Sequence, residues 1–138
     1  MDCAQTIEEK ENVTRSSMLT LAFWILAATV VLGSGLAFAH LRASRLPPWP
    51  VGALHGVAGA TGLAVLIMAL QGPARGAEYG VSSFGPAAAA LVALALLMGL
   101  VVLLLARRFK RTSGLAIAIH STIAVTAFVL LLAYVSFN

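Results

Sequence analysis

Four long apolar runs, none of which contains a charged residue, dominate this sequence of 138 residues. They cover residues 18–39, 50–70, 84–106 and 114–137. Each run has about 20 residues or more, which is the length that a helix needs to cross a hydrocarbon core about 30 Å thick. The chain is 60% apolar and only 10% charged, so a soluble domain of this size could not cover its apolar surface with polar groups. The sequence therefore predicts an integral membrane protein in a lipid bilayer.

The predicted fold is an all-α, four-helix transmembrane bundle, because a helix satisfies its own backbone hydrogen bonds in lipid. We expect one transmembrane domain over residues 18–138, preceded by a flexible polar tail at residues 1–17. The expected helices cover about 18–40, 50–70, 84–106 and 114–137.

The basic residues predict the orientation of the bundle. Six of the nine lysines and arginines lie in two short loops, at residues 42–45 and 107–111, and all five acids lie on the other side of the membrane. The positive-inside rule then places both basic loops in the cytoplasm and both termini outside. A bacterial inner membrane fits this arrangement. The net charge of +4 is explained by topology, and gives no reason to expect nucleic-acid binding.

The two halves of the sequence resemble each other. Gly33 in the first apolar run can be aligned with Gly99 in the third, and His55 in the second run with His120 in the fourth. Further residues then match. These further matches are Arg42 with Arg108, Thr61 with Thr126, and Gly62 with Ala127. Two repeated helical hairpins with the same topology would be related by an axis along the membrane normal.

Two histidines interrupt the apolar runs at matching places. His55 lies about five residues into the second predicted helix and His120 about six residues into the fourth. At 1.5 Å per residue, both lie about 8–9 Å into the membrane from the cytoplasmic side. We expect the two imidazoles to face each other across the bundle axis.

The residues that share a helical face with these histidines, at i−3, i+4 and i+7, are mostly small. They are Gly52, Gly59 and Gly62 for His55, and Ile117, Ala124 and Ala127 for His120. Small residues allow helices to pack closely in membranes. Beside a facing histidine pair they also leave a slot for a flat macrocycle. We therefore expect one haem b, with His55 and His120 as axial ligands to the metal and with Arg45 and Arg111 paired to its propionates.

With four helices, histidines facing the core and short basic cytoplasmic loops, the chain resembles the bacterial cytochrome b561-type membrane cytochromes. That resemblance implies an oxidoreductase or electron-transfer subunit that exchanges electrons with a quinone or a redox partner protein. The family usually carries enough histidines for two haems. This chain has three histidines in total, so only one bis-histidine haem fits. The third, His40, lies at the end of the first predicted helix, where a cation faces the negative end of the helix dipole.

Other functions remain open at this stage. The histidines could hydrogen-bond to neighbouring helices, or could serve another metal or a proton. The main alternative is a cofactor-free anchor or accessory subunit of a larger membrane complex, and a homo-oligomer is also open. A proton-coupled carrier that uses carboxylates is disfavoured because all five acids lie outside the apolar runs.

Overall fold

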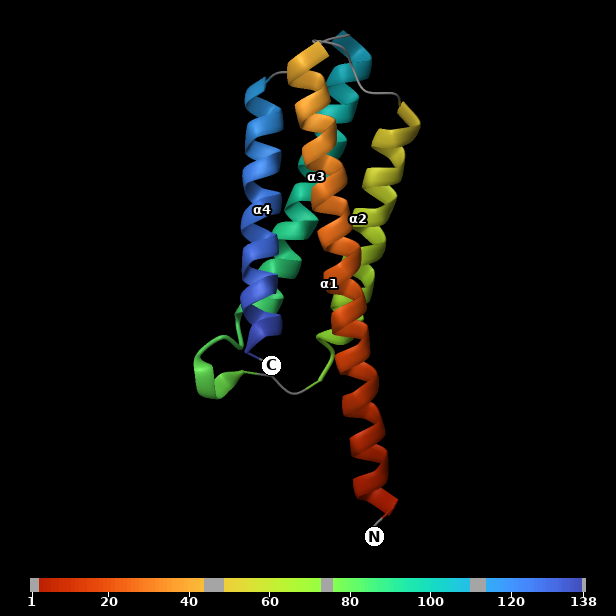
Figure 1. Ribbon diagram of the computed structural model, residues 1–138, viewed down its shortest axis with the longest axis vertical. Coiled ribbons are helices and arrows are strands. Elements are labelled where there is room, and N and C mark those ends of the chain that lie inside the picture. Colours follow the sequence, from red (N-terminus) through yellow and green to blue (C-terminus); the bar gives the residue numbers. More distant parts are fainter. Residues whose placement is uncertain (1–2, 44–48, 73–75, 110–113, 138) are drawn as a thin grey trace.

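The computed structural model describes residues 3–43, 49–72, 76–109 and 114–137. Within these ranges the chain is helical and contains no strand (Figure 1). The helices are α1 (Cys3–Ala43), α2 (Trp49–Ala69), the short 3₁₀ helix η1 (Ala77–Tyr79), α3 (Phe84–Phe109) and α4 (Gly114–Ser136). Helices α1 to α4 are each long and apolar enough to cross a membrane. The prediction of an all-α chain with four helices long and apolar enough to span a membrane is confirmed for the described residues.

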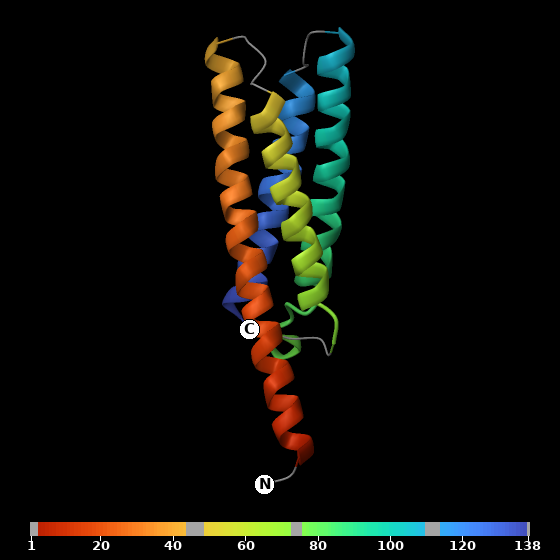
Figure 2. The same ribbon diagram turned by 90° about the vertical axis from the view of Figure 1, so that its right-hand side faces the viewer.

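Helix α1 begins at Cys3, although the sequence analysis expected a flexible tail up to residue 17. Figures 1 and 2 show its N-terminal part projecting beyond the other helices. Contacts between residues four apart support this polar extension: the hydroxyl of Thr14 donates to the carbonyl of Lys10 at 2.9 Å, and Arg15 pairs with Glu11. Hydropathy locates the part of a helix that crosses the membrane, and therefore does not detect a polar continuation of the same helix.

The four helices form a closed ring of neighbours. Helix α1 packs most extensively on α2, and α3 on α4, while smaller contacts join α1 to α4 and α2 to α3. Helices α2 and α4 are therefore diagonal partners across the bundle interior, as are α1 and α3. The two pairs joined by the shortest connections, α1–α2 and α3–α4, make the larger interfaces, whereas α2 and α3, which are joined by the longer connection that contains η1, make a smaller one.

The packed core occupies one half of the bundle. We call residues 18–29, 59–69, 84–95 and 127–136 the core half, and the described residues 30–42, 49–58, 96–108 and 114–126 the histidine half. The main cluster of buried residues lies entirely in the core half, and comprises Leu19, Ala22, Leu26, Leu66, Ala69, Ala88, Val92, Ala127, Leu131 and Tyr134. Among the described residues of the histidine half, only Ala106 is buried. Figure 2 shows the helices closer together near the termini than at the opposite end.

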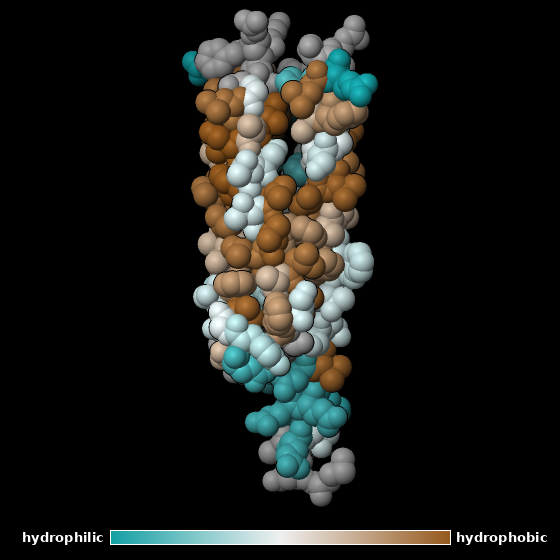
Figure 3. Space-filling model, turned by 60° about the vertical axis from the view of Figure 1, so that its left-hand side comes forward, coloured by the Kyte–Doolittle hydropathy of each residue, from teal (hydrophilic) through white to brown (hydrophobic). Residues whose placement is uncertain are grey.

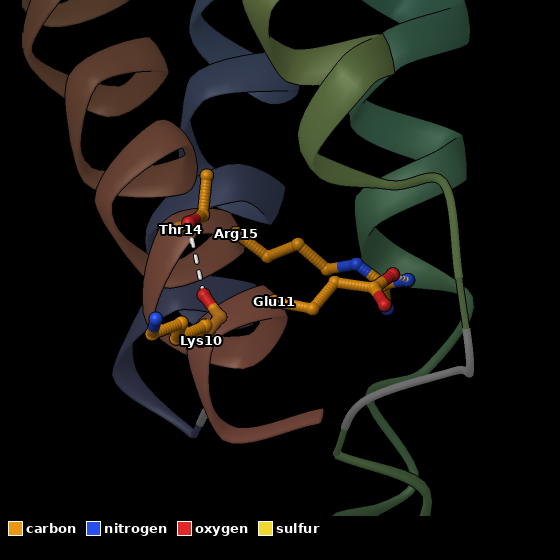
Figure 4. Close-up of polar contacts among 4 residues, drawn as sticks. All are labelled: Lys10, Glu11, Thr14 and Arg15. Carbon is orange, nitrogen blue, oxygen red and sulfur yellow. Dashed lines mark hydrogen bonds and ion pairs between the residues drawn. The ribbon is translucent and has the colours of Figure 1, made fainter. Parts of the chain in front are cut away.

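The core half is closed off by the connection between α2 and α3. The Arg15 side chain is only 17% exposed, and its guanidinium packs against Gly72, whose φ of +137° favours glycine. Figure 4 shows Arg15 reaching from α1 toward the end of α2, with Glu11 beside it. Beyond this contact, the Tyr79 ring of η1 lies 5.8 Å from the ring of Phe137. The α2–α3 connection is thus attached both to α1 and to the end of α4.

The outer surface of the bundle is apolar. Figure 3 shows hydrophobic residues covering the side of the bundle, with hydrophilic residues gathered on the projecting part of α1. Large hydrophobic side chains remain exposed on all four long helices, including Trp24, Leu54, Leu97 and Val129. An apolar surface of this extent is suited to contact with lipid chains.

The close packing of α1 on α2 gives a first prediction. A Cβ at Gly62 would lie 2.7 Å from Leu26 Cδ2, so Gly62→Ala overpacks this interface and lowers the free energy of unfolding by about 1–3 kcal/mol. The matched control is Gly35→Ala, also in a helix, where a Cβ meets nothing within 4 Å. Thermal unfolding in detergent, followed by circular dichroism, measures both. Equal stability of the two variants would contradict the packing described here.

Candidate functional site: two facing histidines

The structure brings His55 and His120 together inside the bundle. His55 lies six residues after Trp49, where α2 begins, and His120 lies six residues after Gly114, where α4 begins. Both are therefore about 9 Å along their helices. Their ring centroids are 6.2 Å apart and the ring planes are inclined at 77°. Since α2 and α4 are diagonal partners, the two imidazoles meet across the interior, as the sequence analysis expected.

Each imidazole rests against a glycine of the preceding helix. A Cβ at Gly33 of α1 would lie 2.6 Å from Cε1 of His55, and a Cβ at Gly99 of α3 would lie 3.2 Å from Cε1 of His120. Gly33 stands ten residues before the end of α1, and Gly99 ten residues before the end of α3. The two contacts therefore have the same register in both hairpins. Any larger residue at either glycine would compete with the ring for space.

His120 is fixed by a hydrogen bond to the backbone of α3. Its Nδ1 lies 2.9 Å from the carbonyl oxygen of Ala95, one helical turn before Gly99. A carbonyl oxygen can only accept, so Nδ1 must donate and carries a proton. In the neutral ring the lone pair then resides on Nε2, which is the atom free to bind a metal or accept a proton.

His55 lacks the corresponding hydrogen bond. Thr29 stands one turn before Gly33, as Ala95 stands one turn before Gly99, and its backbone interacts with the His55 ring. No hydrogen bond of normal geometry results, and Nδ1 of His55 is buried without a partner among the described residues. The hydroxyl of Thr29 donates instead to the carbonyl of Ile25 at 2.8 Å. Buried polar atoms without a partner are uncommon, so this nitrogen marks His55 as a site where a partner is missing.

The separation of the two rings discriminates between two kinds of contact. A direct N–H···N bond of about 2.9 Å would bring the centroids to about 5 Å, because each nitrogen lies about 1 Å from its ring centre. A metal ion bound about 2 Å from one nitrogen of each ring would hold the centroids about 6 Å apart. The observed 6.2 Å is too long for the first arrangement and fits the second, and it also lies within the range of about 4.5–7 Å that ordinary edge-to-face ring contacts have. The two histidines could therefore hold a metal centre between them.

Helix packing fills part of the slot that the sequence analysis expected. A Cβ at Gly59 would lie 3.2 Å from Leu96 Cδ2 and 3.5 Å from Thr29 Cγ2, and the space beside Gly62 is occupied by Leu26. These two glycines thus allow α2 to approach its neighbours. That is the close packing through small residues that membrane helices commonly use.

The other small residues near the two histidines lie in both halves of the bundle. Ala127 is fully buried in the core half, and Ala124 is half-buried nearer to His120. Gly52 and Gly56 lie around His55 in the histidine half, and a Cβ at either meets nothing within 4 Å. Neither Gly52 nor Gly56 is therefore required by a close helix contact.

Three of the described arginines lie at the end of the bundle nearest the histidines. Arg42 lies in the last turn of α1, as does His40, while Arg107 and Arg108 lie in the last turn of α3. These positions suit cations because they face the negative ends of helix dipoles. The proposed propionate partners, Arg45 and Arg111, lie outside the described residues.

Sequence reasoning gave no site role to Gly33 and Gly99, which the structure places against the histidines. The signal was present, because the alignment of the two halves pairs Gly33 with Gly99 and His55 with His120. Residues on α1 and α3 were not connected to the histidines because a helical-face argument relates only residues of one helix. In the described part of the chain, no group of three or more His, Cys, Asp or Glu side chains gathers at one place.

No protein-family model matches the chain, and searches of curated proteins and of solved structures return no match. The resemblance to b561-type cytochromes therefore rests on the helix count, the basic loops and the histidine pair.

The glycine contacts generate a second prediction. Gly33→Ala would displace the His55 ring, because the 2.6 Å approach is shorter than real Cβ contacts allow, whereas Gly99→Ala would shift His120 by only a few tenths of an ångström. Histidine side-chain NMR of the purified protein measures both shifts, and we expect the larger one at His55. The control on the same helix is Gly35→Ala, which should leave both rings unchanged. A response of His55 to Gly35→Ala as large as to Gly33→Ala would contradict the contact.

Proposed function

We propose that this chain is a membrane b-type cytochrome that carries electrons through a single haem b held by His55 and His120. A quinone or a redox partner protein would supply or accept the electrons. The observation that carries the proposal is the pair of imidazoles, contributed by diagonal helices, with centroids 6.2 Å apart. That spacing suits two axial ligands on opposite sides of one metal ion.

The hydrogen bond of His120 supports this role. Histidine ligands commonly donate their other ring N–H to a backbone carbonyl or carboxylate, which fixes the tautomer and orients the ring. The bond from Nδ1 of His120 to the carbonyl of Ala95 is of this kind, and it leaves Nε2 available as a ligand.

The loose packing of the histidine half also supports a bound group. Apart from Ala106, no described residue of that half is buried, although close packing is a main source of stability between membrane helices. Figure 3 shows hydrophilic atoms at the bottom of a hollow between helices in this half. Gly33 and Gly99 add no side chain to the interior from α1 and α3. These features suit a site where a planar group, rather than side chains, completes the packing.

The proposed haem and its two histidine ligands have separate tasks. When bound, haem supplies a reversible one-electron couple whose potential depends on its axial ligands and on burial. His55 and His120 would hold and orient it, and their apolar surroundings would exclude water. One haem in one half of the bundle reaches only part of the way across the membrane, so a partner would have to deliver or remove electrons at the other end.

The proposal also includes an internal repeat and an orientation in the membrane. The chain would consist of two repeated helical hairpins in a bacterial inner membrane, with both termini outside and the basic loops in the cytoplasm. The charge distribution supports the orientation. The common register of the Gly33–His55 and Gly99–His120 contacts supports the repeat.

The haem is tested by the absorption spectrum of detergent-purified protein, expressed with ample haem and reduced with dithionite. We expect a sharp Soret band with resolved α and β bands, the signature of a low-spin, bis-histidine haem. His55→Ala and His120→Ala should each abolish that low-spin spectrum, because each removes an axial ligand. His40→Ala, which alters the third histidine, should preserve it. A featureless spectrum of the unaltered chain would overturn the proposal and favour a cofactor-free anchor subunit.

The orientation is tested through Cys3, which is the one cysteine of the chain. With both termini outside, a membrane-impermeant maleimide added to spheroplasts should label Cys3 without prior lysis. Cys3→Ser controls for labelling elsewhere. Labelling that requires lysis would reverse the proposed orientation.

A further inference from the structure

The two proposed ligands are held differently, although they occupy matching positions in their hairpins. Nδ1 of His120 is bonded to the Ala95 carbonyl, whereas Nδ1 of His55 is buried without a partner. The matching backbone group, at Thr29, interacts with His55 but completes no bond of normal geometry. The two histidines therefore occupy matching positions in their hairpins but differ in their hydrogen bonds.

His120 is held by a group that cannot easily move. Ala95 is buried and lies inside α3, so its carbonyl is fixed by the helix. A ring bonded to it is confined to one tautomer and a narrow range of orientations. Ligands whose geometry is fixed before binding lose less freedom when they bind.

His55 has fewer restraints than His120. Its Nδ1 has no hydrogen bond of normal geometry, and a Cβ at the neighbouring positions Gly52 and Gly56 would meet nothing within 4 Å. The matching positions on α4 carry larger residues, Ile117 and Ser121. The His55 ring can thus exchange its tautomer and adjust its orientation at lower cost than the His120 ring.

We propose that His120 is the anchoring axial ligand and His55 the exchangeable one. This inference rests on the proposed haem site and goes beyond it, because it gives the two histidines unequal roles. In His55→Ala, the iron position that His55 would hold would be open to an added neutral imidazole. The imidazole nitrogen would form one dative bond there, and no electron or proton would be transferred.

The first test compares haem binding by His55→Ala and His120→Ala. We expect His55→Ala to retain haem in a high-spin form, and added imidazole to restore the low-spin spectrum. His120→Ala should bind haem at least about tenfold more weakly, because it removes the oriented ligand together with its supporting bond. Circular dichroism and gel filtration report whether each variant folds. Equal loss of haem in two folded variants, or greater loss in His55→Ala, would overturn the inference.

The second test uses the unaltered chain without haem, and so does not depend on the folding of a variant. Nitrogen-15 NMR of its histidines should show His120 fixed as the Nδ1–H tautomer and His55 as a mixture of tautomers. Two equally fixed rings would overturn the unequal roles while leaving the haem proposal intact. Absence of haem from the wild-type protein after expression with ample haem would instead overturn the proposed function, and with it the assignment of ligands.

Discussion

Every polar group within the hydrocarbon part of a membrane needs a partner inside the protein, because lipid offers none. That constraint accounts for the four long helices, and it extends to their side chains. The hydroxyls of Thr29, Thr122 and Thr126 each donate to the carbonyl four residues earlier, at 2.8, 2.9 and 2.8 Å. Hydroxyls bonded in this way are satisfied locally and tie no helix to another. His120 differs, because its partner is the carbonyl of Ala95 on another helix.

Glycine determines whether a partner on another helix can be reached. His120 reaches the Ala95 carbonyl because Gly99, one turn later on α3, adds no side chain between the ring and the helix. Gly33 allows the corresponding approach of His55 to α1, but the hydrogen bond is not completed there. Two similar glycine contacts thus produce two differently held rings. Whether such a hydrogen bond forms is highly sensitive to small differences in distance and angle.

This sensitivity explains which features could be predicted from the sequence. The four membrane helices follow from apolar runs, and the meeting of His55 with His120 follows from their equal depth in helices that run in the same direction. The start of α1 at Cys3 could not be found, because hydropathy does not detect a helix that continues into water. Gly59 and Gly62 were assigned to a helical face correctly, but only the three-dimensional structure shows Leu96 and Leu26 filling the space beside them. The unequal hydrogen bonding of the histidines depends on distances that no residue pattern encodes.

The uneven packing of the bundle separates its stability from its chemistry. Leu66 and Leu131 are fully buried in the core half, where interdigitated side chains hold the four helices together. The histidine half contributes little packing of this kind, and burying a polar nitrogen there without a bond costs free energy. Nδ1 of His55 bears this cost in the structure. The looser packing of the histidine half would allow the proposed bound group to enter between the helices and engage the histidines. The core half can hold the helices in place before any such group has bound, which keeps the two imidazoles positioned for it.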